Sequence, residues 1–350
     1  MTRALRLVAA GLALVLFAAA CGRTTTISTT TKPLDLYAAE PTAADVKAML
    51  GDSNWWPGPP SFGVRPLDAS STPMSQRFRV TQRFAHVGTS ETFDVAFTQW
   101  SSTSTATTQM SEIKTALGQS ANGAKVGDDV LYYGLQGNGA APYETATFVR
   151  VGSVVTVITW NRKDGLPKID QLGKIATKVV ARLKNVLSGK LRATPLSSTD
   201  AAKLPPKGPD ITLLGSATVP VESVIVMLNF AAPELLSRLL RNAGADSVVF
   251  GDYVLDNDTH REVRAGVLDF VTSTVANEWI DALRGNSVPD ANGIATFYDH
   301  STGQYFSLFT VGTKGAMLVC RSTNDGESAS RSCETPLSRV APAWQLSLQG

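Results

Sequence analysis

Short stretches of alternating apolar and polar residues occur twice in the chain at a nearly constant spacing. In each half the apolar positions fall into two groups, and each residue lies 170 positions from its counterpart. The groups are Phe78, Val80, Phe84 and Phe93, Val95, Phe97 in the first half, and Val248, Phe250, Val254 and Val263, Ala265, Val267 in the second. Because a period of two is typical of half-buried antiparallel strands, each half is predicted to contain a pair of them.

A second pair of strands is predicted further along each half. Residues 145–160 align without a gap with residues 305–320, and both segments contain two apolar runs around a Val-Gly pair, Val151-Gly152 and Val311-Gly312. Two apolar runs separated by a turn residue predict a β-hairpin.

Between the two strand pairs, apolar residues recur at helical spacing. They are Ala106, Met110, Ile113 and Leu117 in the first half, and Val275, Trp279 and Leu283 in the second. Gly118 and Gly285 follow and predict the ends of these helices. Each half also ends in a predicted helix, over residues 169–187 and about 336–346, and opens with a Thr/Ser-x-x-Asp capping signal at Thr42 and Ser197.

These patterns predict an α+β fold of two related domains, each an antiparallel sheet with flanking helices, that arose by internal duplication. The predicted unit is helix, two strands, helix, two strands, helix. The predicted domains are residues 41–190 and 191–350, and a length of 350 residues agrees with two cores. The second domain carries an added segment, residues 220–244, with a helix that starts at Pro233.

Residues 1–20 are predicted to form a leader rather than part of a domain. Arg3 and Arg6 precede an apolar run, residues 7–20, that is too short to span a bilayer comfortably and ends directly before Cys21. The sequence Ala18-Ala19-Ala20-Cys21 resembles the lipobox of bacterial lipoproteins, and the low-charge, Ala/Thr/Val-rich chain resembles actinobacterial surface lipoproteins.

This resemblance implies a defined processing and location. The leader would be removed, and the Cys21 thiol would carry a diacylglycerol of palmitate-type chains. The protein would then be held on the outer face of the cell membrane, with residues 21–40, which are rich in threonine, as a tether.

The charge of the mature chain excludes some partners. Without residues 1–20 it has 30 basic and 30 acidic residues. A nucleic-acid partner needs a concentrated basic face, so none is predicted. The same balance predicts no polybasic membrane patch, and the acyl chains are expected to anchor the protein alone.

After lipidation of Cys21, the remaining cysteines are Cys320 and Cys333. An exported chain lies where disulfides persist, so a disulfide between them is predicted. A metal site is the alternative, but no histidine lies near either cysteine, and two sulfurs do not complete a zinc site.

Residues able to carry catalysis or bind a metal are sparse. The histidines, His86, His260 and His300, lie near strand ends outside any metal-ligand motif and are interpreted as solvated, and the chain has no G-x-S-x-G motif. The densest acidic cluster is Asp252, Asp256, Asp258 and Glu262. A calcium site is possible there, but the order Asp256-Asn257-Asp258 between two predicted strands favours a turn. The sequence therefore predicts no catalytic residue, metal or cofactor.

One ligand-binding feature is predicted. Trp55 and Trp56 lie in the sequence Asn54-Trp-Trp-Pro-Gly-Pro-Pro60, which indicates a stiff loop. Exposed indoles on such a loop stack on sugars or contact apolar ligands, whereas buried ones would pack under the loop. Neighbouring residues of an extended loop point in different directions, so one can be buried and the other exposed.

The leading hypothesis is a non-catalytic, lipid-anchored envelope protein that binds a glycan, a small ligand or an envelope protein. An envelope hydrolase with a site assembled in space is the first alternative, and it requires His, Ser and acidic side chains to converge. A structural subunit of an envelope complex is the second, and it requires an exposed apolar patch.

Overall fold

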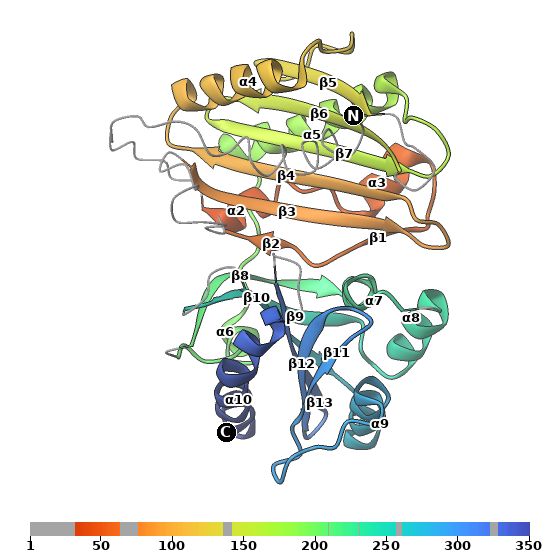
Figure 1. Ribbon diagram of the computed structural model, residues 1–350, viewed down its shortest axis with the longest axis vertical. Helices are drawn as coiled ribbons and strands as arrows, with labels where there is room; N and C mark the ends of the chain where they lie inside the picture. Colours follow the sequence, from red (N-terminus) through yellow and green to blue (C-terminus); the bar gives the residue numbers. More distant parts are fainter. Residues whose placement is uncertain are drawn as a thin grey trace. The chain divides into compact units, whose positions relative to one another are not determined.

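The structure is a computed structural model that describes residues 32–63, 76–135, 142–208, 210–230, 232–256, 261–322 and 328–350. The chain divides into two compact units, with the boundary between Ala193 and Thr194. Each unit is an antiparallel sheet with helices on its faces, so the predicted α+β class is confirmed (Figure 1).

Unit 1 contains the elements up to residue 193. They are α2 (Pro33–Tyr37), α3 (Ala43–Leu50), β1 (Trp55–Pro57), β2 (Ser61–Phe62), β3 (Gln76–His86), β4 (Thr92–Trp100), α4 (Thr103–Leu117), β5 (Asp129–Leu135), β6 (Tyr143–Val151), β7 (Val154–Arg162) and α5 (Ile169–Leu187). The strand order is β1-β3-β4-β7-β6-β5, and β2 pairs with β3.

Unit 2 contains the elements after residue 193. They are α6 (Ser198–Ala201), β8 (Ile211–Pro220), α7 (Glu222–Leu228), α8 (Pro233–Asn242), β9 (Ser247–Leu255), β10 (Arg261–Asp269), α9 (Ser273–Arg284), β11 (Ala295–Asp299), β12 (Gln304–Val311), β13 (Lys314–Ser322) and α10 (Ser328–Gln349). The strand order is β8-β9-β10-β13-β12-β11.

The two sheets have the same connectivity. A hairpin, β3–β4 or β9–β10, is followed by a crossover helix, α4 or α9, that leads to the far edge strand, β5 or β11. The chain then returns through the second hairpin, β6–β7 or β12–β13, to the middle of the sheet. After the crossover helix the predicted unit has two strands, whereas the structure has three. The additional strands are the edge strands β5 and β11. Both are short or polar at one end and give a weak alternation signal.

The predicted local signals are present. Thr42 caps α3 through a capping box with Asp45, and the Ser197 hydroxyl accepts from the Asp200 amide at the start of α6. Gly152 and Gly312 take positive φ in the turns of the second hairpins, where a side chain would be strained.

The predicted correspondence between β3 and β9 is wrong by one residue at all three matched positions. The constant offset of 170 matches Phe84 with Val254, but Phe84 pairs with Phe93, whereas Val263, the counterpart of Phe93, pairs with Tyr253. Because a shift of one residue moves a side chain to the other face of a sheet, Tyr253 takes the place of Phe84 and Val254 points to the opposite side.

The C-terminal helix also differs from the prediction, because α10 begins at Ser328 rather than near Pro336. Proline at the first turn of a helix is common, which made Pro336 the expected start. The helix instead continues through Pro336 and Pro342, and its early turns are joined to β13 through Cys333.

In unit 1, helices cover both faces of the sheet (Figure 1). Leu172, Ile175 and Val179 of α5 are buried on one face, together with residues of β6 such as Val149. On the other face α4 buries Met110 and Ile113 against Trp100 and the strand residues around Phe148. In unit 2 the corresponding core lies between α10 and the sheet, with Trp344 against Phe309.

Candidate functional site

A row of side chains runs across the sheet of unit 1 on the face that carries α4. Consecutive Cα partners place these residues side by side from β1 to β6. They are Trp56, Ala85, Thr92, Asn161 and Glu144. Directly paired residues of antiparallel strands point to the same face, and four interstrand spacings give the row a length of about 19 Å. We call these five residues the polar row.

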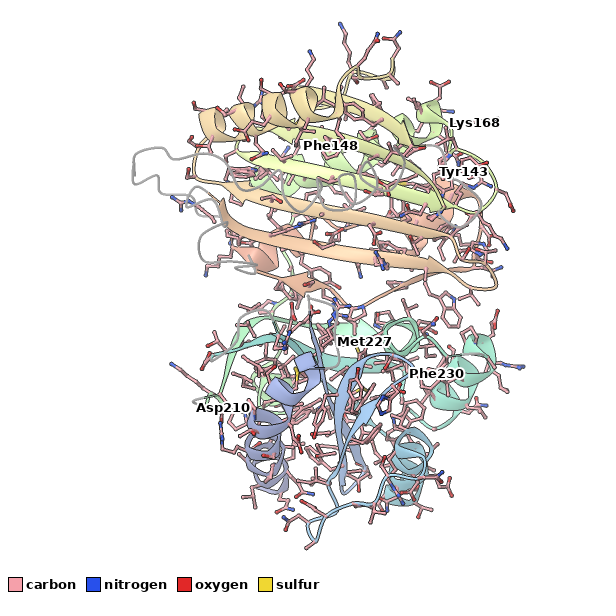
Figure 2. All side chains as sticks on the ribbon, viewed as in Figure 1. Tyr143, Phe148, Lys168, Asp210, Met227 and Phe230 are labelled. Carbon is pink, nitrogen blue, oxygen red and sulfur yellow. A yellow bond between two sulfur atoms is a disulfide. The ribbon has the colours of Figure 1, made fainter. Side chains whose placement is uncertain are left out.

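The polar row lies outside the area that α4 covers. Helix α4 packs over the strand ends near Trp100, Val155, Phe148 and Leu131. Figure 2 shows Phe148 below α4 and Tyr143, next to Glu144, at the other end of β6. Each residue of the row is half-buried, so the row is partly accessible to solvent.

The polar groups of the row retain hydrogen-bonding capacity. The Asn161 Nδ2 group donates to the Thr92 hydroxyl over 3.2 Å. Burial raises the pKa of Glu144, and the negative charge of Asp94 raises it further. A carboxyl group accepts hydrogen bonds when ionised and also donates one when protonated. Beside the row, Arg83 holds Asp94 through two hydrogen bonds of 2.7 and 3.2 Å.

The same position in unit 2 is occupied by charged residues. Here the consecutive Cα partners are Val254, Glu262, Arg321 and Gln304. Glu262 is only 1% exposed and accepts hydrogen bonds from Arg264, at 3.0 Å, and from Arg321. The unit 2 row thus contains a buried ion-pair network, whereas the polar row of unit 1 carries an indole, a hydroxyl, an amide and a carboxyl group with a raised pKa. This difference makes the unit 1 row the better ligand-binding candidate.

The network also changes the interpretation of the acidic cluster. Asp252 and Glu262 are buried within the antiparallel strands β9 and β10, and most of the predicted turn between these strands lies outside the described residues. Asp258 lies outside the described residues. Among the residues that the structure describes, no group of three or more His, Cys, Asp or Glu could hold a metal ion.

Trp55 and Trp56 do not lie in a loop, as the sequence predicted, but in the short strand β1, which pairs with β3. Gly and Pro around the two indoles suggested a loop. The three residues of β1 are nevertheless enough to pair with β3. Alternation along the strand turns the two side chains to opposite faces: Trp55 is 3% exposed, and Trp56 is half-buried. Trp56 is therefore the indole that a ligand can reach.

Trp55 belongs to a packed corner of the core. Its ring meets the His86 ring edge-on at 5.1 Å and the Trp160 ring at 6.4 Å. His86 Nε2 lies 2.8 Å from Asp52 Oδ2, and this hydrogen bond lowers the pKa of Asp52. The Arg162 guanidinium lies over Trp160 at 5.6 Å. Trp55 thus packs as the burial alternative expected.

The histidines do not match a single description. His86 was interpreted as solvated, but its side chain is 13% exposed because the Trp55 ring covers it. Its Nδ1 atom is buried and has no hydrogen-bond partner among the described residues, so this His–Asp pair faces no serine there. His300 is exposed in the turn after β11, where its ring contacts Tyr298, and His260 lies outside the described residues.

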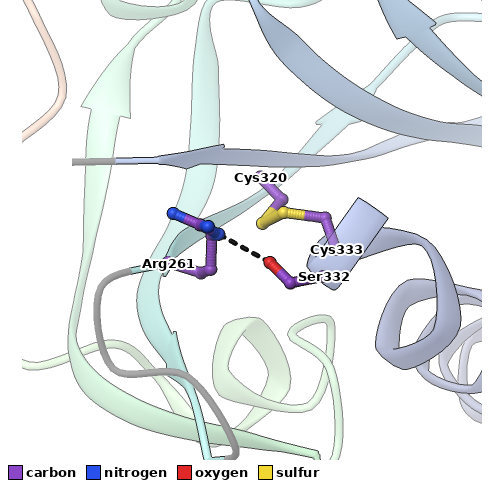
Figure 3. The surroundings of a disulfide bond; sticks show 4 residues. All are labelled: Arg261, Cys320, Ser332 and Cys333. Carbon is purple, nitrogen blue, oxygen red and sulfur yellow. Dashed lines mark hydrogen bonds between the residues drawn. A yellow bond between two sulfur atoms is a disulfide. The ribbon is translucent and has the colours of Figure 1, made fainter. Parts of the chain in front are cut away.

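Cys320 and Cys333 are joined by a disulfide that links β13 to α10, with a Cα–Cα distance of 6.2 Å (Figure 3). Both cysteines are 1% exposed. Next to the bond, Arg261 Nε donates to the Ser332 hydroxyl over 2.6 Å, which brings the start of β10 to the same helix. Cys21 lies outside the described residues.

Two further surface features bear on the alternatives. In the described part of the chain, no helix is long and apolar enough to cross a membrane. Helix α8 exposes Leu235 and Leu239, one turn apart, but scattered apolar residues are also normal on protein surfaces.

Sequence reasoning missed Thr92, Asn161 and Glu144. Each is a polar residue in a strand with an alternating pattern, where polar positions are expected to face solvent. A signal appears only when the strand order is known, because β7 lies between β4 and β6 and brings the three residues into line.

Comparisons with known proteins leave the chain without an assigned family. No protein-family model matches it, and no curated protein matches it significantly. One solved structure with partial similarity is the extracellular domain of PknH from Mycobacterium tuberculosis. The two are 15% identical, with a TM-score of 0.35, and the match covers 44% of this chain and 97% of that one. A likeness of this size assigns neither fold nor function.

Proposed function

We propose that the chain is an exported, lipid-anchored envelope protein that binds a neutral glycan on the polar row of unit 1, without catalysis. The observation that carries the proposal is the half-buried Trp56, which lies in one row with Thr92, Asn161 and Glu144. An indole can stack on the C–H face of a sugar ring, while amide, hydroxyl and carboxyl groups exchange hydrogen bonds with its hydroxyls.

Export and anchoring are supported by separate features. The leader ends at Cys21 in a sequence that resembles a lipobox. The disulfide between Cys320 and Cys333 is of the kind that persists in an oxidising compartment. Labelling of cells with an alkynyl fatty acid tests the anchor directly: the chain is expected to be labelled, and a Cys21→Ala variant that remains labelled would contradict it.

A neutral ligand suits the charges around the polar row. Arg83 and Asp94 neutralise each other beside it, and Glu144 has a raised pKa. Glu144 is the one ionisable residue among the five of the row, so the row offers no positive charge to an anionic ligand. Sugar hydroxyls, in contrast, both donate and accept, which matches Asn161 and Thr92.

Native mass spectrometry of the protein purified gently from its own host's envelope tests the binding proposal. The expected result is a retained mass in pentose or hexose increments that is lost in Trp56→Ala. Leu239→Ala, which removes an exposed apolar side chain in unit 2, is the matched control and should retain the mass. A retained molecule that is not a sugar, or one that Trp56→Ala keeps, would contradict glycan binding at the row.

A further inference from the structure

The balanced charge of the mature chain conceals an uneven distribution. Residues 22–193 contain 19 Lys and Arg against 13 Asp and Glu, whereas residues 194–350 contain 11 against 17. Unit 1 is therefore net basic, and unit 2 is net acidic by the same amount. The net charge of the mature chain is zero, so it does not reveal the basic character of unit 1. For this reason no basic surface was predicted from the sequence.

The excess positive charge of unit 1 is concentrated on α5. The solvent-exposed basic residues on this helix and at its ends are Lys168, Lys174, Lys178, Lys184, Lys190 and Arg192. We call them the α5 basic stripe. Asp170 is the one acidic residue of α5. Among the described residues, no carboxylate forms an ion pair with Lys174, Lys178 or Lys184.

The corresponding helix of unit 2 has no such stripe. In the part of α10 from Ser332 onward, where side chains are described, the charged residues are Glu334 and Arg339. Arg339 is paired with Asp210. Since α5 and α10 end equivalent sheets, the lysines of α5 are not a requirement of the fold.

The predicted tether of residues 21–40 is too long, because Pro33–Tyr37 form α2 and Leu36 and Glu40 are buried in unit 1. The first described helix, α2, contacts α5. Arg182 of α5 donates to the Ala38 carbonyl oxygen over 3.0 Å and pairs with Asp45 at 3.3 Å. Only residues 22–32 separate Cys21 from α2, and eleven residues span at most about 40 Å. An anchor at Cys21 therefore holds α5, about 28 Å long, within reach of the bilayer.

We propose that the α5 basic stripe docks unit 1 on an anionic phospholipid surface. The proposal rests on the proposed anchor only for the closeness of the bilayer. Lysines near an anionic surface each strengthen partitioning about fivefold, and the effect is lost at high salt. Docking through α5 directs the opposite face of the sheet, with the polar row, away from the membrane and toward the envelope.

Vesicle binding of the chain from Gly22 to Gly350 tests the stripe without the lipid, so its outcome is independent of whether Cys21 is acylated. The chain is mixed with vesicles of phosphatidylglycerol and phosphatidylcholine, or of phosphatidylcholine alone, at low and high salt. The expected result is binding to the anionic vesicles at low salt only. Lys174→Gln/Lys178→Gln/Lys184→Gln should bind about 100-fold more weakly.

The matched control is Lys114→Gln/Lys125→Gln/Lys207→Gln, which removes the same charge from exposed lysines outside α5. It should bind like the parent chain. Equal binding to neutral and anionic vesicles, or equal weakening in both triple variants, would overturn the proposal. Tighter binding to soluble polyphosphate than to the vesicles, lost in the α5 variant, would assign the stripe to a soluble polyanion instead.

Discussion

Trp160 and Cys320 occupy the same position in the two sheets. Trp160 is the partner of Phe93 on one side and Thr145 on the other, and Cys320 is the partner of Val263 and Tyr305. In unit 1 this position is filled by an indole packed on Trp55, and in unit 2 by a sulfur bonded to Cys333. One sheet end is thus stabilised by aromatic packing and the other by a covalent link.

Replacement of both cysteines, Cys320→Ser/Cys333→Ser, should destabilise unit 2. The bond closes a loop over a sequence separation of 13 residues, which corresponds to about 3 kcal/mol in the chain-entropy model. Urea unfolding of the chain from Gly22, with and without reductant, checks this. Reductant should lower the unfolding midpoint of the parent's second unit and leave the variant unchanged. An unchanged midpoint in the reduced parent would contradict it.

Glu40 should make the stability of unit 1 depend on pH. Its carboxylate is 3% exposed, and neither oxygen has a hydrogen-bond partner among the described residues. Burial raises its pKa well above the ordinary 4.5, and the charge of Asp94 adds to the rise. The folded chain therefore keeps a proton that the unfolded chain releases above pH 4.5, so stability falls as pH rises from there toward the folded-state pKa.

Glu40→Gln, which is neutral at every pH, should remove this slope. At pH 8 its free energy of unfolding should exceed that of the parent by about 1 kcal/mol or more. Urea unfolding from pH 4.5 to pH 8 measures the slope, with Glu278→Gln, at an exposed position on α9, as the control. A slope in Glu40→Gln equal to that of the parent would show that another group causes it.

Trp55→Ala should destabilise unit 1 far more than Trp56→Ala. Trp55 is buried against His86 and Trp160, and loss of a buried indole costs about 3–5 kcal/mol. Trp56 is half-buried at the sheet edge, and its replacement should cost about 1 kcal/mol. Chemical denaturation of the two variants gives both values; similar losses would place both indoles in the core.

Much of the fold could be predicted because its helices and hairpins are determined by local sequence patterns. The hairpin around Gly152, the helix that ends before Gly118 and the capping box at Thr42 each depend on residues close in sequence. The edge strands β5 and β11 are absent from the predicted unit because an edge strand with polar ends lacks a clear period.

The candidate site was harder to predict, since its residues come together only through strand order. Trp56 was identified from its neighbourhood of Gly and Pro, but Asn161 and Glu144 join its row only through the pairing of Thr92 with Asn161, which spans 69 positions of sequence. The α5 basic stripe was hidden for a different reason: the opposite charge of unit 2 cancels it in any count over the whole chain.

The most direct test of the glycan proposal is a calorimetric titration of the chain from Gly22 with a panel of defined neutral oligosaccharides of glucose, mannose, arabinose and N-acetylglucosamine. Trp56→Ala, Asn161→Ala and Leu239→Ala are titrated in parallel after their folding is checked by circular dichroism. The account predicts saturable binding of at least one sugar, about tenfold or more weaker in the first two variants and unchanged in Leu239→Ala. Binding that Trp56→Ala and Asn161→Ala leave intact, or no binding across the panel, would contradict it.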